Sequence, residues 1–216
     1  MDNVEKYNTA QVVINYLEQL YPEAECALEH RGDPFKLLVM ARLSAQCTDK
    51  RVNEVCVGLF EKYPNAAAMM NADISDIEDS IRSCGLYRTK AQSLHDIAFD
   101  IVHKFNGKVP NTMEELLSMN GVGRKIGNLI LGDCFGIDGI VCDTHCIRIT
   151  NRLGLADSVY PDKVEKQLTE LIPDGKRSDF CHRIVNFGRE ICTARSPKCN
   201  ECGLSSNCKF FSENRK

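Results

Sequence analysis

The sequence predicts an all-α protein. Apolar residues recur at helical spacing along nearly the whole chain, and no segment alternates apolar and polar residues with period two over a useful length. No internal repeat or low-complexity linker interrupts this pattern. Because Gly, Pro and capping residues divide the periodic stretches, we expect about ten short helices.

Local signals bound the helices expected in the first half of the chain. An apolar face over residues 12–20 ends before Pro22. Asp33 followed by Pro34 is typical of an N-cap with proline at the first helical position, and it opens a helix toward Leu43. The other expected helices of this half cover 48–60, 74–81 with Gly85 as a stop, and 94–105 with Gly107 as a stop.

In the second half, Thr112 and Glu115 have the spacing of a capping box and predict a helix start. This helix ends before Gly121, and a further apolar face begins soon after. The remaining expected helices cover 126–130, 147–153 with Gly154 behind it, 164–171 and 178–191.

Length and charge narrow the class of protein. The 216 residues correspond to between one and two domains, since a domain typically has about 150 residues. Residues 176–216 hold nine Lys/Arg and four Asp/Glu, a net of +5, which leaves −8 on residues 1–175. The basic segment is either a solvated tail or a surface that contacts phosphate.

The sequence shows no sign of export or membrane insertion. No apolar run approaches the roughly 18 residues that a membrane span needs. The N-terminus has neither the basic nor the apolar part of a secretory signal. We therefore expect a cytoplasmic protein with no membrane partner.

Twelve cysteines are unusual for a chain that is neither short nor visibly secreted, and they favour reduced thiols or metal ligation over a disulfide framework. Four of them form the spacing C-x6-C-x2-C-x5-C near the C-terminus: Cys192, Cys199, Cys202 and Cys208. Four thiolates in this run can hold a tetrahedral zinc or a [4Fe–4S] cluster. Because only one C-x-x-C pair is present, we favour the cluster. We expect the other eight cysteines, such as Cys56, to be small buried hydrophobes.

The segment Gly121-Val122-Gly123 joins two expected helices in a tight hairpin. Glycines permit a sharp turn and close approach to a ligand, and the amides that open the second helix form an anion site. Lys125 lies in the first turn of this helix, where the dipole disfavours a cation. A neutral amine there is a nucleophile able to form a Schiff base. The alternative is a surface lysine that contacts phosphate.

Eighteen residues after Lys125, Asp143 precedes the next expected helix and is placed as its N-cap. A carboxylate near the lysine would also relay protons or stabilise a cationic intermediate. His145, two residues later, is a weak signal by itself. In the C-terminal run, Arg195 and Lys198 lie between the cysteines, so a cluster there would stiffen a basic loop for phosphate contact. A redox role of the cluster stays open.

These residues together resemble the endonuclease III family of helix-hairpin-helix DNA glycosylases and abasic-site lyases. The hairpin with Lys125, the Asp143-Thr144-His145 triplet and the cysteine spacing carry the resemblance, which extends over nearly the whole chain. Two further segments, around Gln46 and Leu86, are similar to family segments. The chain departs from the common family pattern at Met119-Asn120, Ile126-Gly127 and Cys142.

The resemblance implies two all-α lobes. The first is a six-helix barrel over residues 27–137 that contains the hairpin. The second combines residues 1–26 and 138–216 and carries the C-terminal [4Fe–4S] cluster. It implies a monomer that acts on damaged double-stranded DNA, near the nucleoid if the source is a bacterium.

The resemblance also implies roles for single residues. Lys125 matches the nucleophile and Asp143 the catalytic aspartate. Gln46 matches the residue that fills the gap left by a flipped nucleotide, and Leu86 the apolar wedge beside it. Five further residues are implied to contact DNA: Gly121, Gly123, Arg124, Arg195 and Lys198. Asp49 and His145 match positions near the base pocket. The four cysteines of the C-terminal run match the ligands of the cluster.

The implied reaction is excision of oxidised pyrimidines from duplex DNA, followed by β-elimination through a lysine Schiff base. A glycosylase with another base preference is the main competing hypothesis. A non-catalytic DNA-binding module would keep the hairpin without strand cleavage. A ferredoxin-like electron carrier would leave the hairpin and Lys125 unexplained.

Overall fold

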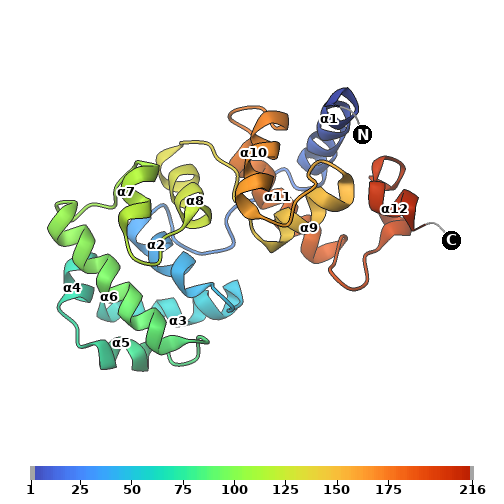
Figure 1. Cartoon of the computed structure of the whole chain (residues 1–216). Coiled ribbons are helices and arrows are strands. Elements are labelled where there is room, and N and C mark those ends of the chain that lie inside the picture. The colour runs from blue at the N-terminus through green and yellow to red at the C-terminus, as the bar shows by residue number, and fades with distance from the viewer. Residues whose placement is uncertain (1–2, 215–216) are drawn as a thin grey trace. The chain divides into compact units, whose positions relative to one another are not determined.

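The computed structural model describes residues 3–214, and these residues are all α, as predicted. They form twelve α-helices and two short 3-10 helices, with no strand among them (Figure 1). The α-helices are α1 (Asn3–Leu20), α2 (Pro34–Leu43), α3 (Asp49–Lys62), α4 (Ala66–Met70), α5 (Ile74–Ser80), α6 (Tyr87–Lys104), α7 (Met113–Ser118), α8 (Arg124–Phe135), α9 (Thr144–Leu153), α10 (Pro161–Leu171), α11 (Arg177–Glu190) and α12 (Lys209–Glu213). The 3-10 helices are η1 (Cys199–Glu201) and η2 (Ser205–Asn207).

The chain divides into two compact units. Residues 26–137 form the first, here called the hairpin unit, which contains α2 to α8. Residues 1–25 and 138–216 form the second, here called the terminal unit, because it holds both ends of the chain. Seven helical segments build the hairpin unit, of which α4 has only five residues.

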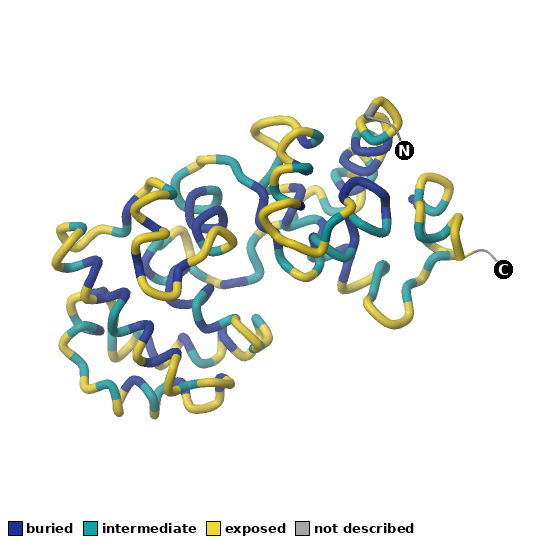
Figure 2. The backbone as a smooth tube through the Cα atoms, viewed as in Figure 1, coloured by how far each residue is buried: buried dark blue, intermediate teal, exposed yellow. Residues whose placement is uncertain are grey.

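Helix α2 lies at the centre of the hairpin unit. The Asp33 side chain caps it by accepting hydrogen bonds from the amides of Phe35 and Lys36 at 2.9 and 3.1 Å, and Pro34 opens the helix. Seven of its ten residues are buried, which Figure 2 shows as a nearly continuous dark stretch. Because α3, α6 and α8 all pack against α2, its two ends position the loops of this unit.

Two helices of this unit differ from the expectation. Helix α6 begins at Tyr87 rather than near 94, since Leu86 adopts a left-handed conformation directly before it. Helix α4 was not expected, because a run of Ala66-Ala67-Ala68 carries little apolar periodicity. Asn65 caps α4 by accepting a hydrogen bond from the Ala68 amide at 2.9 Å.

In the terminal unit, α1 packs against α10 and α11, and α9 packs against α11. Helix α11 is capped from a distance: the two carboxylate oxygens of Asp138 accept hydrogen bonds from the amides of Gly175, Arg177 and Ser178 at 2.7–3.0 Å. A carboxylate at a helix N-terminus is stabilised by the helix dipole. This contact joins residues nearly forty positions apart, so no local pattern predicts it.

The eight cysteines outside the C-terminal run fall into two groups. Five are buried, as predicted: Cys56, Cys84, Cys142, Cys146 and Cys181. The prediction is wrong for the other three, Cys26, Cys47 and Cys134, which are only half-buried. Within residues 3–214, none of the helices combines the length and the hydropathy that crossing a bilayer requires.

Candidate functional site

The hairpin turn connects α7 to α8 and is held by side chains from two other helices. Gly121 has a φ of +82°, a conformation that favours glycine. A Cβ atom added there would lie 2.5 Å from Ser93 Oγ and 2.8 Å from Arg42 Nε. Arg42 Nε donates to Ser93 Oγ at 2.8 Å, and Ser93 Oγ donates to the Asn120 carbonyl at 3.3 Å. Arg42 in the last turn of α2 and Ser93 within α6 thus fix the turn.

The N-terminus of α8 lies just beyond this turn and is exposed. Its N-cap is Gly123, which has no side chain to accept a capping hydrogen bond. A Cβ atom added at Gly123 would meet nothing within 4 Å, so this side of the turn is open. Gly123, Arg124 and Lys125 are all exposed. Backbone amides and the positive end of the helix dipole therefore meet the surface beside two cationic side chains.

Lys125 is the second residue of α8 and lies in its first turn, as predicted from the sequence. Two positions further on, Gly127 is buried. A Cβ atom added there would lie 2.6 Å from Met113 Sδ of α7. The absence of a side chain at Gly127 therefore leaves room for the Met113 side chain to pack against α8.

Gln46 and Leu86 lie in two neighbouring turns, one after α2 and one before α6. Both adopt left-handed backbone conformations, with φ of 54° and 59°, and both are exposed. A Cβ atom added at Gly85 would lie 3.7 Å from the Gln46 carbonyl oxygen, so the two turns are adjacent. A left-handed conformation costs a residue with a Cβ atom roughly 1–2 kcal/mol, and such strain is concentrated at functional sites.

Lys90 links the helices that carry these two turns through a buried hydrogen bond. Its side chain is 1% exposed, and Nζ donates to the Leu43 carbonyl at the end of α2 at 2.8 Å. Burial lowers the pKa of this amine. This hydrogen bond joins the first turn of α6 to the last residue of α2. It therefore supports the two turns that carry Gln46 and Leu86. Sequence reasoning gave Lys90 no role, because a lysine is normally expected at the surface.

Asp49 is the first residue of α3 and is half-buried. Thr48 caps this helix by accepting a hydrogen bond from the Arg51 amide at 3.3 Å. Only two residues separate Gln46 from Asp49 along the chain. The structure therefore places Gln46, Leu86, Asp49 and the hairpin turn in one unit, around the ends of α2 and α6.

In the terminal unit, Asp143 caps α9, as predicted: its Oδ1 accepts a hydrogen bond from the Cys146 amide at 2.7 Å. His145 lies where α9 meets α11, and Arg148 Nη2 contacts its Nδ1 at 3.2 Å. The same guanidinium donates to the carbonyls of Gly188 and Cys192 at 3.2 and 3.0 Å. Arg148 therefore links the segment of Asp143 to the start of the cysteine run, a connection that the sequence did not reveal.

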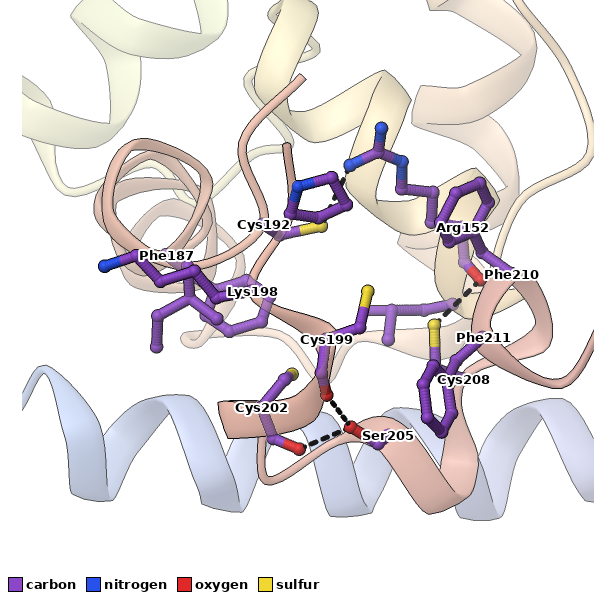
Figure 3. Close-up of a pocket in the computed structure, with 13 residues that line it drawn as sticks. Arg152, Phe187, Cys192, Lys198, Cys199, Cys202, Ser205, Cys208, Phe210 and Phe211 are labelled. Atoms are coloured by element: carbon purple, nitrogen blue, oxygen red, sulfur yellow. Dashed lines mark hydrogen bonds between the residues drawn. The ribbon is translucent and has the colours of Figure 1, made fainter. Parts of the chain in front are cut away.

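The four cysteines of the C-terminal run line one pocket of the terminal unit. Figure 3 shows the sulfurs of Cys192, Cys199, Cys202 and Cys208 around a common space. Apolar side chains surround them, among them Leu153, Phe187, Ile191, Phe210 and Phe211. The four cysteines that are close in sequence thus point their thiols into one pocket.

Arg152 of α9 supports this pocket. Its Nη1 donates to Cys192 Sγ at 3.3 Å and to the Thr193 carbonyl at 2.8 Å, and its Nη2 donates to the Ala194 carbonyl at 2.8 Å. The guanidinium also lies 4.8 Å from the centre of the Phe210 ring. Because Arg152 lies 40 residues before Cys192, sequence reasoning missed it.

The donor set fits an iron–sulfur cluster. Four thiols meet in an apolar pocket, and Arg152 supplies a positive charge beside the thiolates that cluster binding requires. Burial raises the pKa of the Cys202 and Cys208 thiols, so ligation must displace their protons. Arg195 and Lys198 are exposed in the loop between the first two cysteines.

Comparison with known proteins agrees with this geometry. Residues 39–174 match the HhH-GPD superfamily of base excision DNA repair proteins, and residues 192–208 match the iron–sulfur binding domain of endonuclease III. Endonuclease III of Synechocystis sp. is 43% identical over 204 residues, which cover 94% of this chain and 93% of the relative. Endonuclease III of Bacillus subtilis is 39% identical over 199 residues, which cover 91% and 90%.

Solved structures give the same result. A trapped covalent intermediate of an endonuclease III with DNA matches with a TM-score of 0.92 and 38% identity, covering 96% of this chain and 97% of that one. A thermostable thymine-DNA glycosylase, at 23% identity, shares the fold with a TM-score of 0.87. The chain therefore belongs to the endonuclease III family of HhH-GPD base excision DNA repair proteins, and it carries the [4Fe–4S] cluster of that family.

Proposed function

We propose that this chain excises oxidised pyrimidines from duplex DNA and then nicks the strand by β-elimination, with Lys125 as the nucleophile. The observation that carries the proposal is an exposed lysine in the first turn of α8, beside a helix N-terminus whose N-cap is glycine and an open glycine turn. A relative of known structure was trapped as a covalent intermediate with DNA. Attack of a protein amine on the DNA sugar would form such a covalent intermediate.

In the proposed reaction, Nζ of Lys125 attacks C1′ of the damaged nucleotide. The C1′–N bond to the base breaks, and the base leaves with its electron pair and takes up a proton. The attached amine then loses a proton, and the C1′–O4′ bond of the sugar ring breaks as O4′ takes up a proton, which leaves a protonated Schiff base between Lys125 and C1′. Loss of a proton from C2′ breaks the C3′–O bond, which cuts the strand 3′ to the lesion, and water finally releases the lysine.

Asp143 is proposed as the carboxylate that offsets the positive charge developing on the sugar. Electrostatic stabilisation of this kind is effective when the charged group is held in place before the reaction. Its hydrogen bond to the Cys146 amide holds the carboxylate at the N-terminus of α9. A carboxylate at this position also interacts favourably with the positive end of the helix dipole.

The proposed DNA contacts divide by chemistry. The amides around Gly121, Gly123 and Arg124 bind one backbone phosphate, and Arg195 and Lys198 bind others. These contacts position the duplex without reading its sequence. Binding should therefore weaken as the salt concentration rises. Lys198→Ala removes one phosphate contact and should make the negative slope of log affinity against log salt shallower by about 0.9.

Gln46 and Leu86 are proposed to act on the base stack. Leu86, 60% exposed and held in a strained turn, is suited to wedge between bases, while Gln46 fills the space of the flipped nucleotide. A damaged base costs less to unstack, which supplies part of the selectivity. Asp49 and His145 are proposed near the base pocket, although His145 also contributes to the packing of α9 on α11 through Arg148.

Cys192, Cys199, Cys202 and Cys208 are proposed as the four ligands of the cluster. When bound, the cluster supplies a rigid cross-link that shapes the basic loop. Arg152 holds the backbone at Thr193 and Ala194 in the same loop. We further propose that the enzyme is a monomer in the cytoplasm, where chromosomal DNA is its substrate.

Borohydride trapping tests the proposed nucleophile. Wild type and Lys125→Ala are incubated with a duplex that carries one thymine glycol, and borohydride is added. We expect a covalent protein–DNA band with wild type that is absent with Lys125→Ala. Lys108→Ala, which removes another exposed lysine of the hairpin unit, serves as the matched control and should trap like wild type.

The outcomes separate the competing hypotheses. No wild-type band on thymine glycol, with an intact cluster by visible absorption, rejects this base as substrate. A band on an abasic site alone would then indicate a glycosylase of another base preference. Binding without any band on either substrate would indicate a DNA-binding module that lacks the lysine chemistry.

A further inference from the structure

A second group of metal-ligating side chains lies in the hairpin unit, apart from the residues assigned above. Cys26 and His30 lie in the segment before α2, and Asp133 lies near the end of α8. Their ligand atoms, one from each residue, lie within 4.8 Å of one another. All three residues are half-buried, so the group is partly shielded from solvent and still accessible to an ion.

Cys134, the next residue of α8, places a second thiol beside the group, with its Sγ 3.9 Å from His30 Nδ1. It lies outside the set of atoms that are all within 4.8 Å of one another, so its side chain must turn toward the other donors to become the fourth ligand. Two sulfurs, an imidazole nitrogen and a carboxylate oxygen form a donor set typical of Zn²⁺. Zinc bonds of about 2.0–2.3 Å place tetrahedral ligand atoms roughly 3.3–3.8 Å apart. The ligand atoms of Cys26, His30 and Asp133 therefore need to approach one another by at most about 1–1.5 Å.

The backbone on both sides of the group is already held in place. The Asn53 side chain of α3 accepts a hydrogen bond from the Glu29 amide at 3.1 Å and donates to the Ala27 carbonyl at 2.9 Å. These contacts fix the chain between Cys26 and His30. The other two donors lie on a regular helix, so little conformational entropy remains to be lost when a metal binds.

The surroundings of the two thiols raise their pKa values, so both stay protonated until a cation arrives. Burial, together with the charge and hydrogen bond of Asp133, raises the pKa of the Cys26 thiol to about 12. Burial also raises the pKa of the Cys134 thiol to about 11. A dication would displace both protons. His30 Nδ1 accepts a hydrogen bond from the Gly32 amide at 3.2 Å, and a metal bound at this nitrogen would replace that contact.

We propose that Cys26, His30, Asp133 and Cys134 form a structural zinc site that fastens the segment before α2 to the last turn of α8. Binding of one Zn²⁺ releases the two thiol protons and leaves two thiolates, one imidazole and one carboxylate on the metal. The site belongs to the hairpin unit, whereas the four-cysteine run belongs to the terminal unit. Its role is to stabilise the hairpin unit and not to take part in base excision.

Zinc binding to the purified holoprotein tests the proposal. The protein is dialysed against Zn²⁺ with a competing chromophoric chelator, and zinc and iron are counted per chain. We expect one zinc in wild type with the iron content and the visible absorption of the cluster unchanged. Affinity should fall at least tenfold in Cys26→Ser and His30→Ala. Cys47→Ser, which alters another half-buried thiol of the same unit, should bind zinc like wild type.

Co²⁺ provides a second measurement, since thiolate-to-cobalt charge transfer reports sulfur ligation directly. We expect this absorption in wild type and Cys47→Ser, and its weakening in Cys26→Ser and Cys134→Ser. His30→Gln repeats the test with a smaller change of shape. Zinc uptake that is absent from wild type, equal in all variants, or accompanied by loss of iron would overturn the proposal.

Discussion

Replacing Gly121 with alanine probes how the hairpin turn is built. With φ at +82°, alanine would pay roughly 1–2 kcal/mol for the left-handed conformation. Its Cβ would also lie 2.5 Å from Ser93 Oγ and 2.8 Å from Arg42 Nε, which disrupts the hydrogen bonds from Arg42 to Ser93 and from Ser93 to Asn120. Each hydrogen bond contributes about 0.5–1.5 kcal/mol. The free energy of unfolding should fall by about 2–5 kcal/mol.

Gly123→Ala is the matched control, only two residues away. Gly123 has a φ of −106°, and an added Cβ would meet nothing within 4 Å. Because alanine is less favourable than glycine at an N-cap, the free energy of unfolding of this variant should fall by no more than about 1 kcal/mol, less than in Gly121→Ala. Urea unfolding followed by circular dichroism measures both variants, with the slope m compared to check that the unfolded states agree. Equal losses in the two variants, or no loss in Gly121→Ala, would refute the geometric reasoning.

Two further predictions concern buried or pocket-lining cations. Burial lowers the pKa of Lys90 below 10.5, so between that lowered pKa and 10.5 the unfolded chain holds a proton that the folded chain has released. Wild-type stability should therefore rise with pH across this window, and Lys90→Met should remove the rise in urea unfolding at a series of pH values. Arg152→Met should lose the cluster faster in air, measured by visible absorption, because it removes the contacts to Cys192 Sγ and the loop behind it. Arg195→Met removes an exposed charge from the same loop and should bleach like wild type; equal rates in the two variants would contradict this role of Arg152.

Helix starts were predictable where one side chain caps one helix. Asp33 and Thr112 both act as N-caps at the expected positions. In the capping box, Glu115 accepts a hydrogen bond from the Thr112 hydroxyl at 2.7 Å. Such contacts span three residues, so the sequence displays both partners together. The start of α6 was predicted too late, because the left-handed conformation of Leu86 depends on the turn packed beside it.

The cysteines also divide into those whose grouping was predictable from local sequence and those whose neighbours depend on packing. The C-terminal run was recognisable since its four members are close in sequence, and the structure places them around one pocket. Cys26 and Cys134 were expected in the core, and instead lie half-buried next to His30 and Asp133. More than a hundred residues separate the two halves of this group. Nothing near either cysteine in the sequence indicates its neighbours.

The sequence by itself determined the all-α architecture, the hairpin with Lys125, the cap at Asp143 and the spacing of the four ligand cysteines. Each depends on residues within a few turns of one another, where periodicity and capping chemistry act directly. Only the tertiary structure decided that Lys90 is buried against Leu43, that Arg152 supports the cysteine pocket, and that His30 meets Asp133. Those contacts arise when distant helices pack, and packing selects partners by shape and by the need to satisfy buried polar groups, which local sequence does not record.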